Sequence, residues 1–211
     1  MRSWLSVLIT DAESKKVFDI PIAPSLYSLS NKMDNSLLAV RDINHKYIVV
    51  ESTKVFDPEF CFYGPMGYDI GNVIANMIFA WANGDAAGAA DFCKWVEDVL
   101  VDVINMTKEK MEKYYDEHVT DTMCRNELYK KYYMDTIIED TSAVAGLELI
   151  RRIVGMANVK DITTIADEAK RARAEKICIT AAIDFIKNRS DKKCGKCFLK
   201  TLKDAIAEVD A

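Results

Sequence analysis

Two acidic residues between a strand-like run and a glycine-rich turn constrain the fold most, within residues 54–71 (KVFDPEFCFYGPMGYDIG). Apolar residues lead into Asp57-Pro58-Glu59, an aromatic turn follows, and a helical pattern begins at Tyr68. A short strand, paired carboxylates, a tight turn and a helix place charge at a strand end, where open sites are commonly built. Because proline fixes its own φ and restrains the residue before it, Asp57 and Glu59 are held apart at a nearly fixed angle.

The paired carboxylates of Asp57 and Glu59 predict a magnesium site. Mg²⁺ prefers oxygen ligands and keeps phosphate oxygens among its partners. The alternative is a surface turn with two solvated acids, which the spacing alone favours. Carboxylates that converge on one cleft would support the metal site, and carboxylates on opposite faces would exclude it.

A longer run around these acids, VFDPEFCFYGPMGYDIGNVIANMIFA, resembles the metal-binding segment of S-methyl-5-thioribose kinases. These enzymes belong to the aminoglycoside-phosphotransferase branch of the protein-kinase-like fold. In this family an Asp-x-Glu replaces the Asp-Phe-Gly of protein kinases, so the resemblance assigns Mg²⁺ to Asp57 and Glu59. The motif FYGPMGYDIG is particular to the family, and Tyr68 is its one departure, in place of Phe. A second similarity, LIRRIV, places Arg151 and Arg152 at the family's twin arginines.

The resemblance covers residues 51–187 and implies an α+β, mainly α fold. We expect a protein-kinase-like C-terminal lobe with a few short N-terminal strands over residues 47–211, after an atypical leader, residues 1–46. The family transfers the γ-phosphate of ATP to the 1-hydroxyl of 5-methylthioribose in methionine salvage. By resemblance, 5-methylthioribose and ATP are the expected substrates and Mg²⁺ is the expected cofactor.

Arg151 and Arg152 are candidate substrate-binding residues. Neighbouring side chains on a helix point about 100° apart, so the two arginines straddle one edge of it. Each guanidinium offers a rigid fork of donors that suits sugar hydroxyls and phosphate oxygens. The alternative is a solvated pair held to Glu148 by a weak helix salt bridge. The resemblance favours the substrate role, in which both arginines hold the methylthioribose.

Asp42 is the candidate catalytic residue. The family's catalytic loop reads His-Gly-Asp-Leu-His-Thr-Gly-Ser, and residues 40–47 read VRDINHKY. Asp42 stands at the place of the catalytic Asp, which holds the substrate hydroxyl while facing the γ-phosphate. However, the first His and the Gly are absent, and the separation from Asp57 is shorter than in the family. The alternative is an ordinary loop acid.

Residues 1–50 contain no glycine. Kinases of this fold need a Gly-rich loop over the phosphates and a strand Lys paired with a helix Glu, so we expect the N-terminal nucleotide lobe to be missing. The chain is then either a kinase completed by a separate N-lobe chain or a catalytically inactive remnant that binds the sugar or a protein. Residues 1–24 read as a hairpin, which we expect to dock on the lobe or on a second copy of the chain.

Apolar residues recur at helical spacing from Tyr68 onward. The first predicted helix ends at Asn83-Gly84-Asp85, and later ones cover residues 129–153, 162–186 and 198–209. Between them lies a long second helix whose core-facing stripe is predicted to comprise Phe92, Trp95, Val96, Val99, Val103 and Met106.

The net charge of -5, with no basic stripe, argues against nucleic acid as a partner. No apolar run reaches the about 18 residues that suggest a membrane span, and no signal-peptide pattern opens the chain. Of six cysteines, only Cys194-Gly-Lys-Cys197 has the spacing of metal ligands, and nothing nearby completes a zinc site. We therefore expect free, reduced thiols in a cytoplasmic protein.

Overall fold

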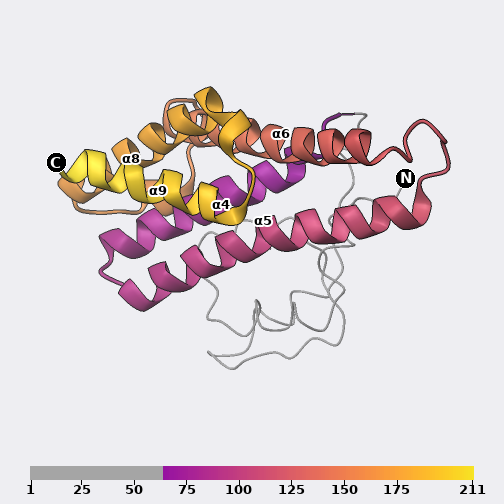
Figure 1. Cartoon of the computed structure of the whole chain (residues 1–211). Helices are drawn as coiled ribbons and strands as arrows, with labels where there is room; N and C mark the ends of the chain where they lie inside the picture. Colours follow the sequence, from indigo (N-terminus) through magenta and orange to yellow (C-terminus); the bar gives the residue numbers. More distant parts are fainter. Residues whose placement is uncertain (1–63) are drawn as a thin grey trace, which may run out of the picture. The chain divides into compact units, whose positions relative to one another are not determined.

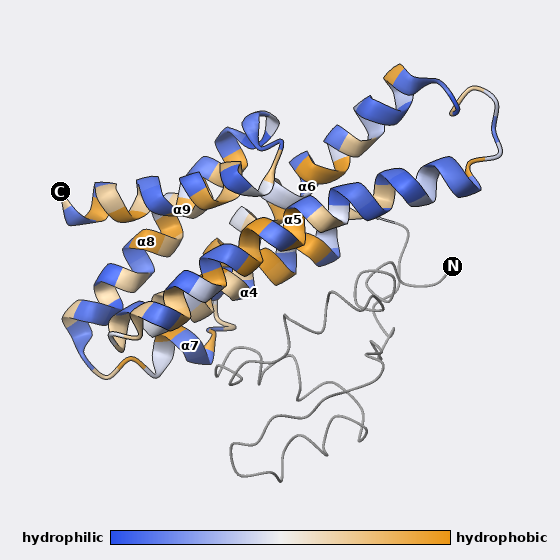
Figure 2. Ribbon diagram, turned by 60° about the horizontal axis from the view of Figure 1, so that its bottom comes forward, coloured by the Kyte–Doolittle hydropathy of each residue, from blue (hydrophilic) through white to orange (hydrophobic). Residues whose placement is uncertain are grey.

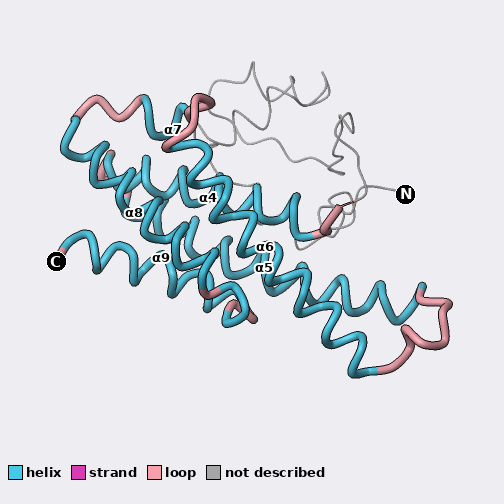
Figure 3. The backbone as a smooth tube through the Cα atoms, turned by 90° about the horizontal axis from the view of Figure 1, so that it is seen from above, coloured by secondary structure: helices cyan, strands magenta, loops and turns pink. Residues whose placement is uncertain are grey.

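The computed structural model describes residues 64–211, and all the regular structure in this part of the chain is helical (Figures 1 and 3). The chain divides into two compact units, Met1–Gly64 and Pro65–Ala211, and every described helix lies in the second. The expected mainly α fold is confirmed for these residues, whereas the predicted strands and the leader, residues 1–46, lie outside them. The elements are α4 (Gly67–Ala86), α5 (Ala90–His118), α6 (Glu127–Ile153), α7 (Lys160–Thr163), α8 (Glu168–Lys187), the 3-10 helix η4 (Arg189–Asp191) and α9 (Gly195–Asp210).

Two glycines one turn apart bring α4 directly against α6. A Cβ on Gly67 would lie 2.4 Å from the backbone nitrogen of Thr141, and a Cβ on Gly71 would lie 2.7 Å from the backbone oxygen of Thr141. No side chain fits in these places, so the two helix backbones approach closely. Gly146 plays the same part between α6 and α8, where its Cβ would lie 2.7 Å from the Ala182 oxygen. Helix α6 is thus packed tightly on two sides.

The turn between α4 and α5 lies later than the sequence predicted. Helix α4 continues through the expected stop at residues 83–85 and ends at Ala86. Gly88 then takes a φ of 75°, in the left-handed region that glycine adopts without steric cost. The backbone N–H of Ala89 donates to the Gly84 oxygen at 2.8 Å, which closes the turn and starts α5.

The helix predicted over residues 162–186 is two helices in the structure. Helix α7 ends at Thr163, and α8 begins at Glu168. Asp167 caps α8, because its carboxylate accepts from the backbone N–H groups of Ala169 at 2.9 Å and Lys170 at 3.1 Å. An aspartate in this position satisfies two donors that a helix start leaves unpaired, so a new helix begins there.

Charged residues hold the connection between α8 and α9. Asp184 accepts hydrogen bonds from Lys192, from the Thr201 hydroxyl at 2.6 Å and from the Asn188 side chain at 2.6 Å. Burial alone would raise the pKa of Asp184, but these hydrogen bonds and the Lys192 charge outweigh it and lower that pKa below its usual value. Helix α9 begins at Gly195, three residues before the predicted start.

Apolar residues gather where the helices face one another, as the colouring of Figure 2 shows. In α5, however, the buried face is not quite the predicted stripe: Val96 and Val99 are buried, but Phe92, Trp95, Val103 and Met106 are only half-buried. No helix between residues 64 and 211 is both long and apolar enough to cross a membrane. The largest fully buried side chains are Phe79, Phe185, Phe198, Ile74, Ile78, Leu100, Ile104, Ile138, Leu149, Ile177, Leu202 and Thr107.

One end of the α5–α6 pair extends past the other helices (Figures 1 and 3). We call residues 112–133 the distal hairpin. Its connection is held by the Tyr115 hydroxyl, which donates to the Cys124 backbone oxygen at 2.7 Å. Large apolar side chains are exposed here, with Met123 at 84%, Leu128 at 80% and Tyr132 at 64%. The distal hairpin therefore has few buried contacts of its own.

Candidate functional site

The last turn of α6 brings Arg151 and Arg152 onto one buried carboxylate, that of Glu148. Arg151 donates through Nε to Oε2 at 2.7 Å and through Nη2 to Oε1 at 2.8 Å. Arg152 donates through Nε to Oε1, also at 2.8 Å. This geometry follows from helical spacing, because residues three and four positions apart share a face. The salt bridge to Glu148, which the sequence offered as the alternative to a substrate role for the two arginines, is therefore present.

Burial and charge differ sharply within this cluster, Glu148–Arg151–Arg152. The Glu148 side chain is 6% exposed, whereas those of Arg151 and Arg152 are 54% and 32% exposed. Hydrogen bonding to Glu148 raises the pKa of Arg151 above its usual value, despite partial burial. Two cations share one anion, so the cluster keeps a net positive charge at an open surface. Such a surface suits oxygen-rich or anionic ligands.

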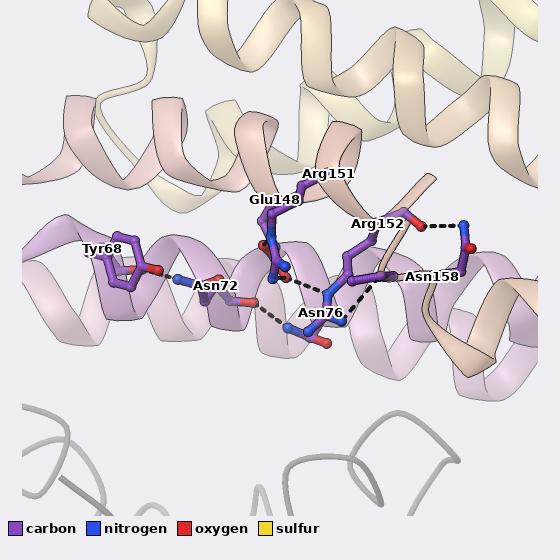
Figure 4. Close-up of polar contacts among 8 residues, drawn as sticks. Tyr68, Asn72, Asn76, Glu148, Arg151, Arg152 and Asn158 are labelled. Atoms are coloured by element: carbon purple, nitrogen blue, oxygen red, sulfur yellow. Dashed lines mark hydrogen bonds and ion pairs between the residues drawn. The ribbon is translucent and has the colours of Figure 1, made fainter. Parts of the chain in front are cut away.

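The segment after α6 folds back on the same arginines (Figure 4). Arg152 Nη1 donates to the Ala157 oxygen at 3.2 Å. The Asn158 side-chain amide donates to the oxygens of Arg152 at 3.3 Å and Gly155 at 3.4 Å, which occupies carbonyls at the helix end. Arg152 is thus fixed both by Glu148 and by the following turn.

A row of polar residues on α4 lies beside the cluster, as Figure 4 shows for Tyr68, Asn72 and Asn76. The Asn72 side-chain amide donates to the backbone oxygen of Tyr68 at 2.8 Å. The Asn76 side-chain amide donates to the backbone oxygen of Asn72, also at 2.8 Å. Sequence reasoning did not select these residues, although polar side chains at a spacing of four on an apolar helix indicate an edge of this kind.

The other predicted site residues, Asp42, Asp57 and Glu59, lie outside the described residues. Within residues 64–211, no group of three His, Cys, Asp or Glu side chains is placed to hold a metal ion. The two arginines are therefore the part of the predicted site whose surroundings can be described. They meet at Glu148, next to the polar edge of α4.

Comparison with known proteins gives matches to methylthioribose kinases. The chain is 34% identical to methylthioribose kinase 1 of Oryza sativa subsp. japonica over 161 residues, 67% of this chain and 37% of that protein. It is 28% identical to the methylthioribose kinase of Escherichia coli O45:K1 (strain S88 / ExPEC) over 205 residues, 88% of this chain and 49% of that protein. The methylthioribose kinase of Bacillus pumilus (strain SAFR-032) is 33% identical over 135 residues, 64% of this chain and 33% of that protein.

No protein-family model matches the chain. The matched part of each of these relatives is half of its length or less. The same name nevertheless recurs in plant and bacterial relatives, over most of this chain in several of them. The chain belongs to the methylthioribose kinase family.

Proposed function

We propose that this chain acts in the cytoplasm as part of a methylthioribose kinase with a kinase-like C-terminal lobe. The reaction is transfer of the γ-phosphate of ATP to the 1-hydroxyl of 5-methylthioribose. The supporting observation is the Glu148–Arg151–Arg152 cluster, which lies open at the surface within the region that resembles the family. Sugar hydroxyls are the ligand groups that such a cluster would hold.

The arginines would bind the sugar through the guanidinium nitrogens that do not already donate hydrogen bonds to Glu148 or Ala157. Nε and Nη2 of Arg151 donate to Glu148, as does Nε of Arg152, and Nη1 of Arg152 donates to Ala157. Nη1 of Arg151 and Nη2 of Arg152 are the donors that we assign to the sugar. Since their forks are already oriented, little side-chain entropy is lost when the ligand binds.

Glu148 is a positioning residue in this proposal. Its carboxylate is buried and holds both guanidinium groups at once, so it determines where their outer nitrogens point. A neutral amide at this place could accept fewer hydrogen bonds and would leave two cations close together. Glu148 therefore affects sugar binding without contacting the sugar.

The remaining parts of the reaction are assigned by resemblance. Asp57 and Glu59 are proposed as the Mg²⁺ ligands and Asp42 as the acceptor of the sugar hydroxyl proton. When bound, Mg²⁺ would neutralise charge on the transferring phosphate oxygens. Carboxylate oxygens are the ligands that this ion prefers.

A second candidate function is sugar binding without phosphate transfer. The observation that favours it is the Glu148–Arg151–Arg152 cluster itself, whose outer guanidinium nitrogens could hold a sugar without ATP. The two functions separate in one pair of measurements. A kinase binds both ATP and the sugar and turns them over, whereas the second candidate binds the sugar alone.

Isothermal titration with 5-methylthioribose tests the proposed site. We expect Arg152→Lys to weaken binding about tenfold, because lysine keeps the charge but loses the fork, and one charge-assisted hydrogen bond contributes about 1.5–3 kcal/mol. Glu148→Gln should weaken binding less, since both arginines remain. Arg171→Lys is the matched control, as its guanidinium lies on α8 in a weak pair with Glu175 at 4.0 Å.

Three results would contradict parts of the proposal. Unchanged binding in Arg152→Lys would remove Arg152 from the sugar site while leaving the kinase assignment open. Sugar binding without turnover, in the presence of ATP and Mg²⁺, would favour the second candidate. No binding of either substrate by the unaltered chain would contradict both functions.

A further inference from the structure

Two cysteines meet in the first turn of α9. Cys194 is the N-cap residue and Cys197 lies one turn on, where its backbone N–H donates to the Cys194 oxygen at 2.9 Å. Their sulfur atoms are 3.0 Å apart, about 1 Å longer than a disulfide bond. Both residues are half-buried, so a small reagent can reach the thiols. The pair has the proximity and the access that thiol–disulfide exchange requires.

The backbone around the pair is held in place. The Gly195 N–H donates to the Asn105 side-chain oxygen at 3.0 Å, and a Cβ on Gly195 would lie 2.3 Å from the Val101 oxygen. The start of α9 is therefore pressed against α5. On the other side, Lys193 pairs with Glu139 of α6. Because both thiols sit on a fixed segment, closing a bond between them costs little conformational entropy.

The other described cysteines lie in different surroundings. Cys93 and Cys178 are buried, and burial raises the pKa of Cys93 to about 11 and that of Cys178 to about 12. Cys124 is half-buried but has no second thiol beside it in the described part of the chain. For Cys197, burial opposes ionisation, but hydrogen bonding to Cys194 and the charge of Lys192 lower the pKa below its usual value. Reactivity is therefore expected at Cys197 first.

We propose that Cys194 and Cys197 form a reversible redox pair that exchanges with low-molecular-weight disulfides such as oxidised glutathione. The Cys197 thiolate attacks one sulfur of that disulfide, its S–S bond breaks, and one thiolate leaves. The Cys194 sulfur, after giving its proton to that thiolate, attacks the Cys197 sulfur of the mixed disulfide. A Cys194–Cys197 bond forms and the second small thiolate leaves. The protein loses two electrons and the small disulfide gains them, so the exchange is balanced. This site is separate from the proposed sugar site and does not depend on it.

The test equilibrates the full chain in glutathione buffers of increasing oxidised fraction, followed by acid quenching and alkylation. Cleavage after acidic residues leaves Cys194 and Cys197 in one peptide, whose mass reports the loss of two hydrogen atoms. We expect this peptide to convert without a glutathione adduct. The ratio of oxidised to reduced peptide should change tenfold for each change of about 30 mV in the potential of the glutathione buffer, as expected for a two-electron couple.

Variants identify the two steps. Cys194→Ser keeps a good helix N-cap but removes the second thiol, so Cys197 should accumulate as a mixed disulfide with glutathione. Cys124→Ser is the matched control and should leave the conversion of the pair unchanged. The proposal is overturned if the pair stays reduced under conditions that modify Cys124. Bonds formed only between two chains, or an adduct on Cys197 that persists in the unaltered chain, would overturn it equally.

Discussion

The first two turns of α6 and the rest of the helix lie in contrasting surroundings. Its C-terminal half packs between α4 and α8, with glycines where the backbones meet, and it carries the Glu148–Arg151–Arg152 cluster. Its first two turns, residues 127–133, belong to the distal hairpin, where large apolar side chains face outward. The Glu148–Arg151–Arg152 cluster therefore lies on the part of α6 that packs closely against two other helices. Precise side-chain placement depends on tight packing behind it, not on helix content alone.

The largest effect is expected from Gly71→Ala. The added Cβ would meet the Thr141 oxygen and the Val144 Cβ, each at 2.7 Å, so α4 and α6 must separate. Overpacking of this kind costs about 1–3 kcal/mol, and alanine recovers about 1 kcal/mol of helix propensity. We expect a net loss of stability of up to about 2 kcal/mol in urea unfolding, together with weaker sugar binding.

Gly88→Ala is the control for Gly71→Ala. No atom lies within 4 Å of the added Cβ, and the positive φ alone opposes the change. It should cost about 1 kcal/mol and leave sugar binding unaltered. If both variants bind the sugar normally, the packing of α4 on α6 does not position the cluster. The contrast between the two parts of α6 would then have no bearing on sugar binding.

A smaller effect, with a pH dependence, is expected from Asp184→Asn. The pKa of Asp184 is lowered in the folded chain, so its stabilisation is complete above the unfolded value and is lost as pH falls through the folded one. Because the group is partly exposed, we expect a loss of about 1 kcal/mol at pH 7. Urea unfolding at pH 7 and below about pH 4 should show a shallower acid loss in the variant.

Asp98→Asn provides the comparison for Asp184→Asn. Asp98 pairs with Lys94 one turn away on α5, and both side chains are at least 60% exposed. Its removal should change stability by about 0.5 kcal/mol or less. Equal acid sensitivity in the Asp184→Asn chain and the unaltered chain would show that the Lys192 and Thr201 contacts contribute nothing measurable.

The smallest effect is expected in the distal hairpin, from Tyr132→Ser. This side chain is 64% exposed and contacts the Tyr129 ring at a centroid distance of 6.4 Å. Substitutions at such surface positions usually change stability by about 0.5 kcal/mol or less. A loss above 1.5 kcal/mol in thermal or urea unfolding would mean that the distal hairpin is covered by something in solution.

The sequence predicted where helices form better than which sides of them are buried. In α5, apolar residues extend around much of the circumference, so several faces fit a period of 3.6, and the partners select one that includes Ile104 but leaves Met106 half-buried. The break before α8 depends on one cap, Asp167, whose hydrogen bonds outweigh a pattern that continues through it. The local sequence pattern does not determine which face of a helix is buried or where packing and capping end it.

The candidate site divides in the same way. Arg151 and Arg152 could be selected from sequence because their spacing and the family motif are both local. That Glu148 is buried, and so binds both guanidinium groups firmly, depends on where α6 packs. The polar row on α4 has a local signal in its spacing of four, but its place beside the cluster depends on the close approach of α4 and α6 at Gly67 and Gly71.

Helix α5 runs unbroken through both surroundings, from Ala90 to His118. Its hydrogen-bonded ladder is continuous, yet the opening events that expose its amides to solvent differ along it. We expect amides near Leu100 to exchange with deuterium only when the bundle opens, and those after Met111 to exchange when the distal hairpin frays. We therefore expect one helix to belong to two cooperative units, with the boundary near Met111, about two turns from the C-terminal end.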